Sequence, residues 1–263
     1  MDKILVIKVG TSVLTRRTEE GYLRLDKSTF ATIGRQITAL RHQGTSVIVV
    51  SSAAIGAGMM ATGITQRPDA AHEMPTLQAL ASIGWRHIMN AWSQALGDEA
   101  VGELLITRHE LNLTDERREL LGVVEALLAN GHTPIVNEND AISHEEIAFG
   151  DNDRLAVELA CVLKRSKQFT HDISVVLLSD VDGVYTDIHD PATRIAHISD
   201  VALAKQYVRG VMSDGGTGGM ASKFAAAQIA MNNSIDMYIA DGRRDDAIMA
   251  ALEGVAGTSF MSD

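Results

Sequence analysis

The sequence has little cysteine, little proline and few aromatic residues. The single cysteine, Cys161, cannot form a disulfide within the chain, so a reducing compartment such as the cytoplasm is expected. No activating motif surrounds Cys161, and it is interpreted as a buried small residue rather than a reactive thiol. Only four prolines occur and none lies in a linker-like run. A single domain over residues 1–263 is therefore predicted.

Long apolar runs and an excess of basic charge are also missing. No stretch approaches the ~20 apolar residues of a membrane-spanning helix, and no leader with a basic and then an apolar region begins the chain. The chain has 23 Lys and Arg residues and 34 Asp and Glu residues, which gives a net charge of −11. We expect a soluble protein that binds neither nucleic acid nor anionic membranes. Any phosphate site must be locally positive.

Short apolar runs alternate with amphipathic stretches along the chain. Val47–Val50 is a continuous apolar run, and Ile4–Val9 and Ile173–Ser179 are largely apolar, as expected of strands that are buried on both faces. Apolar residues at helical spacing lie between them, for example from Asp26 to Gly44. The pattern predicts an α/β fold, a three-layer α/β/α sandwich with a mainly parallel central sheet, and ligands at the carboxyl ends of its strands. Thr114 is expected to cap a later helix.

Polar segments follow the first two predicted strands. Lys8 lies in an otherwise apolar strand, where a charge is costly unless paired, and Gly10 lets the backbone approach a ligand closely. Ser51 and Ser52 lead into a helix whose N–H groups suit an anion. Each segment also has a simpler interpretation: a lysine that reaches the sheet edge, and small residues that pack a helix tightly on the sheet.

The segment Gly56-x-Gly58-x-x-Ala61 has the spacing of a dinucleotide fingerprint. Four residues separate Ser51 from Gly56, so the glycines are predicted to lie inside the helix and not in the turn before it. The acidic residue that should end a second strand is also missing, because Asp69 lies in a loop. A dinucleotide oxidoreductase is therefore disfavoured.

Short polar side chains are dense in the middle of the chain. Asn137-Glu138-Asn139-Asp140 follows a predicted strand, and Gly150-Asp151-Asn152-Asp153 opens a predicted helix. Such residues favour turns and caps, which could explain either segment alone. Together they favour a site for a zwitterion, because a carboxylate pairs with an α-ammonium and amide N–H groups donate to an α-carboxylate.

Two further segments lie in the last third of the chain. Ser179-Asp180-Val181-Asp182-Gly183 follows an apolar run and is compatible with an ordinary turn. Gly215-Gly216-Thr217-Gly218-Gly219 runs into a predicted helix with Lys223 near its start, which favours a phosphate-binding loop over a surface loop. It is not a Walker A motif.

Taken in this order, the five segments resemble the amino acid kinase family over essentially the whole chain. The Lys8, Ser179 and glycine-rich segments are similar to those of UMP kinases, aspartokinases and N-acetylglutamate kinases. The Asn137–Asp140 segment followed by Gly150–Asp153, and the loop that leads to Lys223, resemble the glutamate 5-kinases within that family. The resemblance implies transfer of a phosphoryl group from ATP, with Mg²⁺, to the side-chain carboxylate of L-glutamate.

The same resemblance implies roles for individual residues. Lys8 and Lys223 would contact the transferring phosphoryl group, and Asp153 would hold both lysines in position. Glutamate would be bound by Ser52, Asn137, Asp140 and Asn152. The nucleotide would be bound by Lys8, Gly10, Ser179, Asp180, Thr217, Gly218, Gly219, Met220, Ala221, Ser222 and Lys223. No protein ligand for a metal is predicted.

The chain departs from the family pattern in three places. Ala53 stands where the family usually has a glycine, and Ser179 stands where a threonine is common. The PUA domain that many glutamate 5-kinases carry is expected to be absent, because the chain ends at Asp263. The resemblance also implies a homo-oligomer, frequent inhibition by proline, and a glutamyl-phosphate reductase as partner in proline biosynthesis.

Alternative functions remain open at this point. N-acetylglutamate would have no use for Asp140 as a counter-ion, and UMP would call for more arginine than residues 137–153 offer, since the nearest is Arg154. A non-catalytic nucleotide-binding regulator is disfavoured by the presence of both Lys8 and Lys223.

Overall fold

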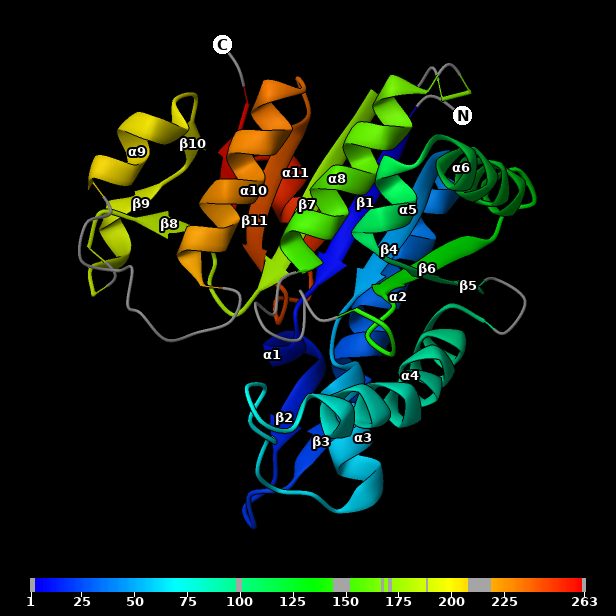
Figure 1. Ribbon diagram of the computed structural model, residues 1–263. Helices are drawn as coiled ribbons and strands as arrows, with labels where there is room; N and C mark the ends of the chain where they lie inside the picture. The colour runs from blue at the N-terminus through cyan, green and yellow to red at the C-terminus, as the bar shows by residue number, and fades with distance from the viewer. Residues whose placement is uncertain are drawn as a thin grey trace.

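The computed structural model of the protein describes residues 3–97, 101–143, 152–166, 168–169, 172–187, 189–207 and 219–261. An eight-stranded sheet crosses the molecule in the order β10-β12-β11-β7-β1-β4-β6-β5 (Figure 1). Its strands are β1 (Lys3–Val9), β4 (Thr45–Ser51), β5 (Val101–Ile106), β6 (Thr133–Glu138), β7 (Asp172–Ser179), β10 (His197–Ile198), β11 (Asp236–Asp241) and β12 (Thr258–Phe260). Among the strand pairs that the described residues form in this sheet, only β11 and β12 are antiparallel. The predicted mainly parallel sheet is confirmed.

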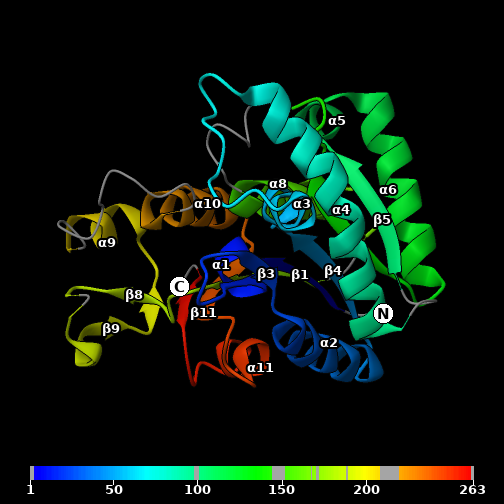
Figure 2. The same ribbon diagram turned by 90° about the horizontal axis from the view of Figure 1, so that it is seen from below.

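Helices cover both faces of the sheet, as Figure 2 shows. One face carries α2 (Lys27–His42), α4 (Met74–Leu96) and α11 (Ala247–Leu252), and the other carries α5 (Arg108–Asn112), α6 (Thr114–Ala129), α8 (Asn152–Arg165) and α10 (Met220–Asn232). β1 supplies Ile4 and Val6 to the core under α8, and Leu5 and Ile7 to the core under α2. Because both faces are buried, the strand reads as a continuous apolar run.

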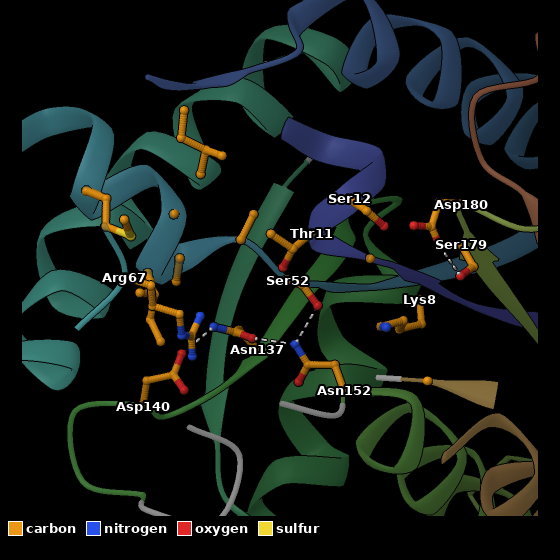
Figure 3. Close-up of a pocket in the computed structure, with 18 of the residues that line it drawn as sticks. Lys8, Thr11, Ser12, Ser52, Arg67, Asn137, Asp140, Asn152, Ser179 and Asp180 are labelled. Atoms are coloured by element: carbon orange, nitrogen blue, oxygen red, sulfur yellow. Dashed lines mark hydrogen bonds between the residues drawn. The ribbon is translucent and has the colours of Figure 1, made fainter. Parts of the chain in front are cut away.

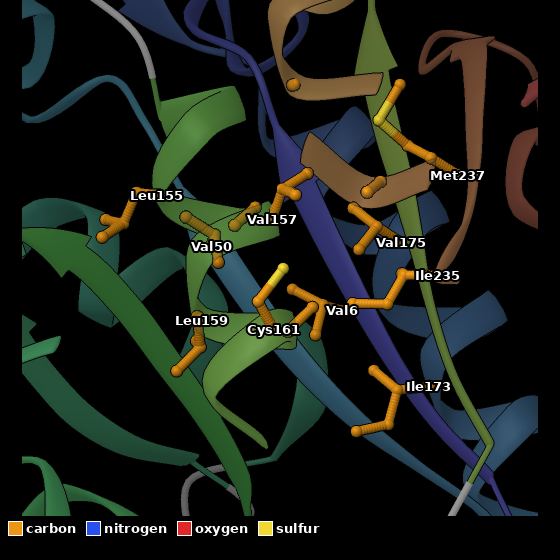
Figure 4. Close-up of a cluster of buried hydrophobic side chains, with 14 of the residues drawn as sticks. Val6, Val50, Leu155, Val157, Leu159, Cys161, Ile173, Val175, Ile235 and Met237 are labelled. Carbon is orange, nitrogen blue, oxygen red and sulfur yellow. The ribbon is translucent and has the colours of Figure 1, made fainter. Parts of the chain in front are cut away.

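The core under α8 contains the single cysteine. Figure 4 shows Leu155, Leu159 and Cys161 of α8 against Val6 and other strand residues. Cys161 is 4% exposed, and burial raises the pKa of its thiol. The prediction of a buried structural cysteine is confirmed.

The order of the strands creates a crevice beside β1. This strand pairs with β4 on one side and β7 on the other, and all three run parallel. The chain therefore leaves β1 in one direction and later returns across the sheet to the opposite side. In open α/β sheets, ligands bind at the carboxyl ends of strands where the order reverses in this way.

Close packing of α3 (Ala54–Thr62) on α4 explains Gly58, the second of the two glycines that resemble a dinucleotide fingerprint, whereas a Cβ at Gly56 would lie 2.6 Å from Leu23 Cδ2. Gly58 lies inside α3, as predicted. A Cβ at Gly58 would lie 1.9 Å from the backbone oxygen of Leu80, and one at Gly84 would lie 1.9 Å from that of Ala54. The sequence allowed the interpretation that small residues here pack a helix tightly on the sheet. Gly58 instead allows α3 to approach another helix, α4.

Several local predictions are wrong or incomplete. Leu113, not Thr114, is the N-cap of α6, and Thr107 caps the unpredicted α5 with its side chain. The last predicted helix begins at Ala247 rather than Arg244. Other elements lacked a recognisable periodicity because they are short: α1 (Thr11–Leu14), β2 (Thr15–Arg17), β3 (Leu23–Leu25), β8 (Val184–Tyr185), β9 (Arg194–Ile195), α9 (Val201–Tyr207), β10 and β12. Within the described ranges, no helix has both the length and the apolar character to cross a membrane.

Candidate active site

A cavity of about 530 Å³ opens at the carboxyl ends of β1, β4 and β7. Its walls come from segments far apart in the sequence, which meet there because the three strands are neighbours. Lining residues from the predicted site are Lys8, Gly10, Ser52, Asn137, Asp140, Asn152, Ser179, Asp180, Gly219 and Lys223.

Two lysines share one buried carboxylate at the base of this cavity. Lys8 Nζ lies 2.6 Å from Asp153 Oδ1, and Lys223 Nζ lies 3.1 Å from Asp153 Oδ2. Asp153 is fully buried, and the two lysines are 6% and 4% exposed. The structure thus brings together the three residues predicted as catalytic, from β1, α8 and α10.

The local structure explains why these charges meet. Lys8 has the same parity in β1 as Ile4 and Val6, so it faces α8 and α10 where the strand ends. Asp153 is in the first turn of α8, where the helix dipole favours a negative charge. Burial alone would raise the pKa of Asp153, but Lys8 and Lys223 lower it to about 2. The carboxylate is therefore ionised and pairs with both lysines.

A series of side-chain hydrogen bonds begins at Asn152, the residue before Asp153, and extends across the cavity (Figure 3). Asn152 Nδ2 donates to Ser52 Oγ at 3.1 Å and to Asn137 Oδ1 at 2.9 Å. Asn137 Nδ2 in turn donates to Asp140 Oδ2 at 3.2 Å. All four residues predicted to bind glutamate take part in this series of hydrogen bonds. One detail differs from the prediction: Asn137 is part of β6 rather than of the segment after it.

Asp140 is the acidic end of the hydrogen-bonded chain. It is 8% exposed, and burial raises its pKa to about 6, although Asn137 and the Arg67 guanidinium act in the opposite direction. The carboxylate is therefore ionised at neutral pH, at a cost that a cationic ligand would offset.

The opposite end of the cavity carries the residues predicted to bind the nucleotide. Gly10 follows β1, where a Cβ would lie 3.3 Å from the Leu178 backbone oxygen. Ser179 ends β7, and its hydroxyl donates to Asp180 Oδ1 at 3.2 Å. Gly219 is the N-cap of α10.

The predicted glycine-rich loop is described only in part. Met220, Ala221 and Ser222 form the first turn of α10, and Ser222 Oγ donates to the Gly219 backbone oxygen at 2.8 Å. The predicted residues Thr217 and Gly218 lie outside the described residues.

The family departure at Ala53 has a visible structural consequence. Ala53 is the N-cap of α3 and has φ 81° and ψ 10°, in the left-handed region that favours glycine. It is 5% exposed and lines the cavity. The chain therefore places a side chain where the backbone geometry suits glycine.

Two arginines that the sequence analysis missed also line the cavity. Arg17 comes from β2 and Arg67 from the loop between α3 and α4. Arg154, the arginine singled out from the sequence, instead pairs with Glu158 at 2.7 Å. The missed residues are remote in sequence from every polar motif, and only the fold brings them to the site.

Curated relatives resemble the chain over most of its length. A glutamate 5-kinase of Symbiobacterium thermophilum is 38% identical over 98% of this chain and 95% of its own length. One of Clostridium acetobutylicum is 40% identical over 93% of this chain and 88% of its own length. One of Thermus thermophilus is 36% identical, and the match spans 98% of this chain and 67% of that protein.

Solved structures support the fold. Carbamate kinase from Giardia lamblia bound to AMP-PNP is 17% identical, with a TM-score of 0.65 over 100% of this chain and 99% of that chain. An isopentenyl phosphate kinase is 18% identical, with a TM-score of 0.62 over 98% of this chain and all of that chain. The profile of the amino acid kinase family matches residues 3–241. The chain belongs to the amino acid kinase family.

Proposed function

We propose that the chain transfers the γ-phosphoryl group of ATP to the side-chain carboxylate of L-glutamate. The observation that carries this proposal is that one cavity joins the cluster of Lys8, Asp153 and Lys223 to the hydrogen-bonded group of Asn137, Asp140 and Asn152. The first is suited to a phosphoryl group and the second to an amino acid. The name of the curated relatives, glutamate 5-kinase, supports the same conclusion.

The proposed reaction needs electrostatic stabilisation more than proton transfer. The side-chain carboxyl of glutamate has a pKa near ~4.3 and is already ionised at neutral pH. One of its oxygens attacks the γ-phosphorus while the bond to the β-phosphate oxygen breaks, and ADP leaves. Lys8 and Lys223 would stabilise the charge on the moving group, and Asp153 would hold them together.

The lysine cluster also addresses the unfavourable global charge. The protein carries a net charge of −11, which repels both ATP and glutamate at long range. Lys8 and Lys223 place two ammonium groups at the base of the cavity, where they oppose this repulsion at short range. That local charge supports an anionic substrate at this position.

Mg²⁺ is proposed to enter with the nucleotide rather than as a resident ion. Among the described residues, no group of three or more His, Cys, Asp or Glu side chains is arranged to hold a metal. ATP phosphates and water supply most Mg²⁺ ligands in kinase sites. Ser179, Asp180, Gly10 and the start of α10 would bind this nucleotide.

The wider setting follows from the product. Glutamyl 5-phosphate is an unstable acyl phosphate, and we expect a glutamyl-phosphate reductase to consume it in proline biosynthesis. A homo-oligomer and a cytoplasmic location are part of the same proposal.

A phosphate-bearing acceptor such as UMP is a second candidate. Residues 137–153 contain no arginine that could bind the phosphate of UMP, but Arg17 and Arg67 reach the same cavity from other parts of the chain. Asp140 still favours a cationic acceptor group, which L-glutamate has and UMP lacks.

The test is turnover of purified protein with ATP and Mg²⁺ against L-glutamate, N-acetylglutamate, L-aspartate and UMP. Hydroxylamine traps an acyl phosphate as a hydroxamate, and released ADP reports transfer to any acceptor. We expect hydroxamate with L-glutamate at a rate far above the other three. ADP release with UMP but no hydroxamate would overturn the proposed acceptor, and ATP binding without any turnover would point to a regulator.

A further inference from the structure

Arg67 lies at the end of the cavity that is remote from the lysine cluster. It comes from the loop between α3 and α4, and it is exposed to solvent on one side. In Figure 3, the labelled residues run from Arg67 and Asp140 at one end, through Asn137 and Asn152, to Lys8 at the other. A ligand that spans the cavity would therefore meet Arg67 with the group farthest from the phosphoryl site.

The guanidinium of Arg67 lies close to Asp140. Burial lowers the pKa of Arg67 and the Asp140 carboxylate opposes that shift, while Arg67 in turn opposes the effect of burial on the pKa of Asp140. Within the described part of the chain, no hydrogen bond or ion pair involves the Arg67 guanidinium. Its five N–H donors are therefore available to a ligand in the cavity.

Asp140, in contrast, has a hydrogen-bond partner within the protein. Its Oδ2 accepts a hydrogen bond from Asn137 Nδ2 at 3.2 Å, and it is 8% exposed. The site thus places a buried carboxylate next to an exposed guanidinium. Free amino acids carry an ammonium and a carboxylate on one carbon atom, so an anion and a cation side by side can bind both.

We propose that Arg67 binds the α-carboxylate of the amino acid acceptor while Asp140 binds its α-ammonium. The inference rests on the proposed function and names how that substrate is recognised. Arginine suits this task because its planar fork can donate two parallel hydrogen bonds to one carboxylate. The side-chain carboxylate of the same molecule would then extend past Asn152 toward Lys8.

The pairing makes Arg67 a determinant of specificity. Charge-assisted hydrogen bonds contribute roughly 1.5–3 kcal/mol, which corresponds to a preference of about 10- to 100-fold. An acceptor whose α-carboxylate is replaced by an amide should lose that preference. Because Arg67 is far from the reacting phosphorus, its loss should raise KM for glutamate much more than it lowers kcat.

The experiment compares L-glutamate with its α-amide, which keeps the α-ammonium and the side-chain carboxylate. The ratio of kcat/KM for the two acceptors is measured in the wild type, in Arg67→Gln and in the control Arg17→Gln. Arg17 lines the same cavity, but its Nη1 donates to the Gly21 backbone oxygen at 2.9 Å. We expect Arg67→Gln to reduce the ratio by about 10- to 100-fold and Arg17→Gln to leave it within about twofold.

Three outcomes bear on the inference. An unchanged ratio in Arg67→Gln, with both acceptors weakened equally, would overturn it, because Arg67 would then act only through the general field or the fold. Equal use of both acceptors by the wild type would also overturn it. If the wild type does not phosphorylate glutamate at all, the proposed function fails, and the same ratio measured by calorimetric binding in the presence of a non-hydrolysable ATP analogue still decides the role of Arg67.

Discussion

The ammonium of Lys8 lies 2.6 Å from the carboxylate of Asp153, although Lys8 belongs to the first strand and Asp153 to a helix in the second half of the chain. Asp153 also holds Lys223 through its other oxygen. The two lysines are thereby kept from moving apart, and neither needs to reorganise when a phosphate arrives. Preorganised charges of this kind usually make the largest single contribution to catalysis.

Replacing either lysine should therefore impair turnover. We expect Lys8→Met or Lys223→Met to lower kcat by about 10²–10³, the usual effect of losing one well-placed electrostatic group. Methionine preserves most of the buried volume, so the fold should survive, as circular dichroism can verify. Turnover within a few fold of the wild type in either variant would contradict the catalytic role that we propose.

Replacing the shared carboxylate should instead destabilise the fold. Asp153→Asn removes the buried carboxylate that Lys8 and Lys223 share, and breaking a buried ion pair typically costs about 3–5 kcal/mol. Urea unfolding at pH 7 measures the loss. Removing one of the two buried ammonium groups should recover part of it, so Lys8→Met combined with Asp153→Asn should unfold at a higher urea concentration than Asp153→Asn alone. A double variant that is less stable than Asp153→Asn would show that charge burial is not the cause.

Much of this site could be predicted from the sequence because its residues follow strands directly. Lys8, Ser52 and Ser179 come at or after the ends of apolar runs, and parallel strands bring their carboxyl ends to one edge. Arg67 could not be found in this way, since it lies in an irregular loop and reaches the cavity only through the packing of α3 on α4. The predicted cap at Thr114 failed for a related reason: a suitable side chain shows that a cap is possible, whereas neighbouring structure decides which residue is used.

Asp140 should make both stability and activity depend on pH. Its pKa rises from 3.8 to about 6 on folding, so the folded state binds the proton more strongly than the unfolded chain does. The free energy of unfolding should therefore fall as pH rises from about 4 to about 6, and Asp140→Asn should remove this loss. In the absence of substrate, we expect Asp140→Asn to have a higher Tm than the wild type at pH 7.5.

The same titration should act in the opposite direction on substrate binding. Only the ionised carboxylate can pair with an α-ammonium, so kcat/KM for glutamate should rise with pH through about 6 in the wild type. Asp140→Asn should lower kcat/KM for glutamate and abolish its rise with pH, while ATP binding persists. If kcat/KM of the variant still rises with pH through about 6, the rise is caused by the titration of another group.

Ala53 offers a test of backbone strain beside the cavity. The left-handed conformation costs an L-residue roughly 1–2 kcal/mol, and Ala53→Gly should remove this cost. Part of the resulting gain in stability is lost because glycine has greater conformational freedom in the unfolded chain. We expect Ala53→Gly to raise the free energy of unfolding by about 0.5–1 kcal/mol. Ser234 has φ 54° in the exposed turn between α10 and β11, so Ser234→Gly is a matched control that should give a similar gain. A loss of stability in Ala53→Gly alone would mean that the Ala53 methyl contributes packing that outweighs its backbone cost.

The contact between α3 and α4 should tolerate no added methyl group. A Cβ at Gly84 would meet the Ala54 backbone oxygen at 1.9 Å and the Gly58 backbone nitrogen at 2.4 Å, and neither is a flexible side chain that could move aside. Gly84→Ala should therefore destabilise the protein by about 1–3 kcal/mol or more, despite the better helix propensity of alanine. Gly122 is a helical glycine in α6 with open space for 4 Å around the position that a Cβ would take, so Gly122→Ala should stabilise by up to ~1 kcal/mol. Ala53 and Ala54 begin α3 at the cavity, so separation of the two helices in Gly84→Ala should also raise KM for glutamate. A normal KM in a destabilised variant would show that the helix pair supports the fold without positioning the site.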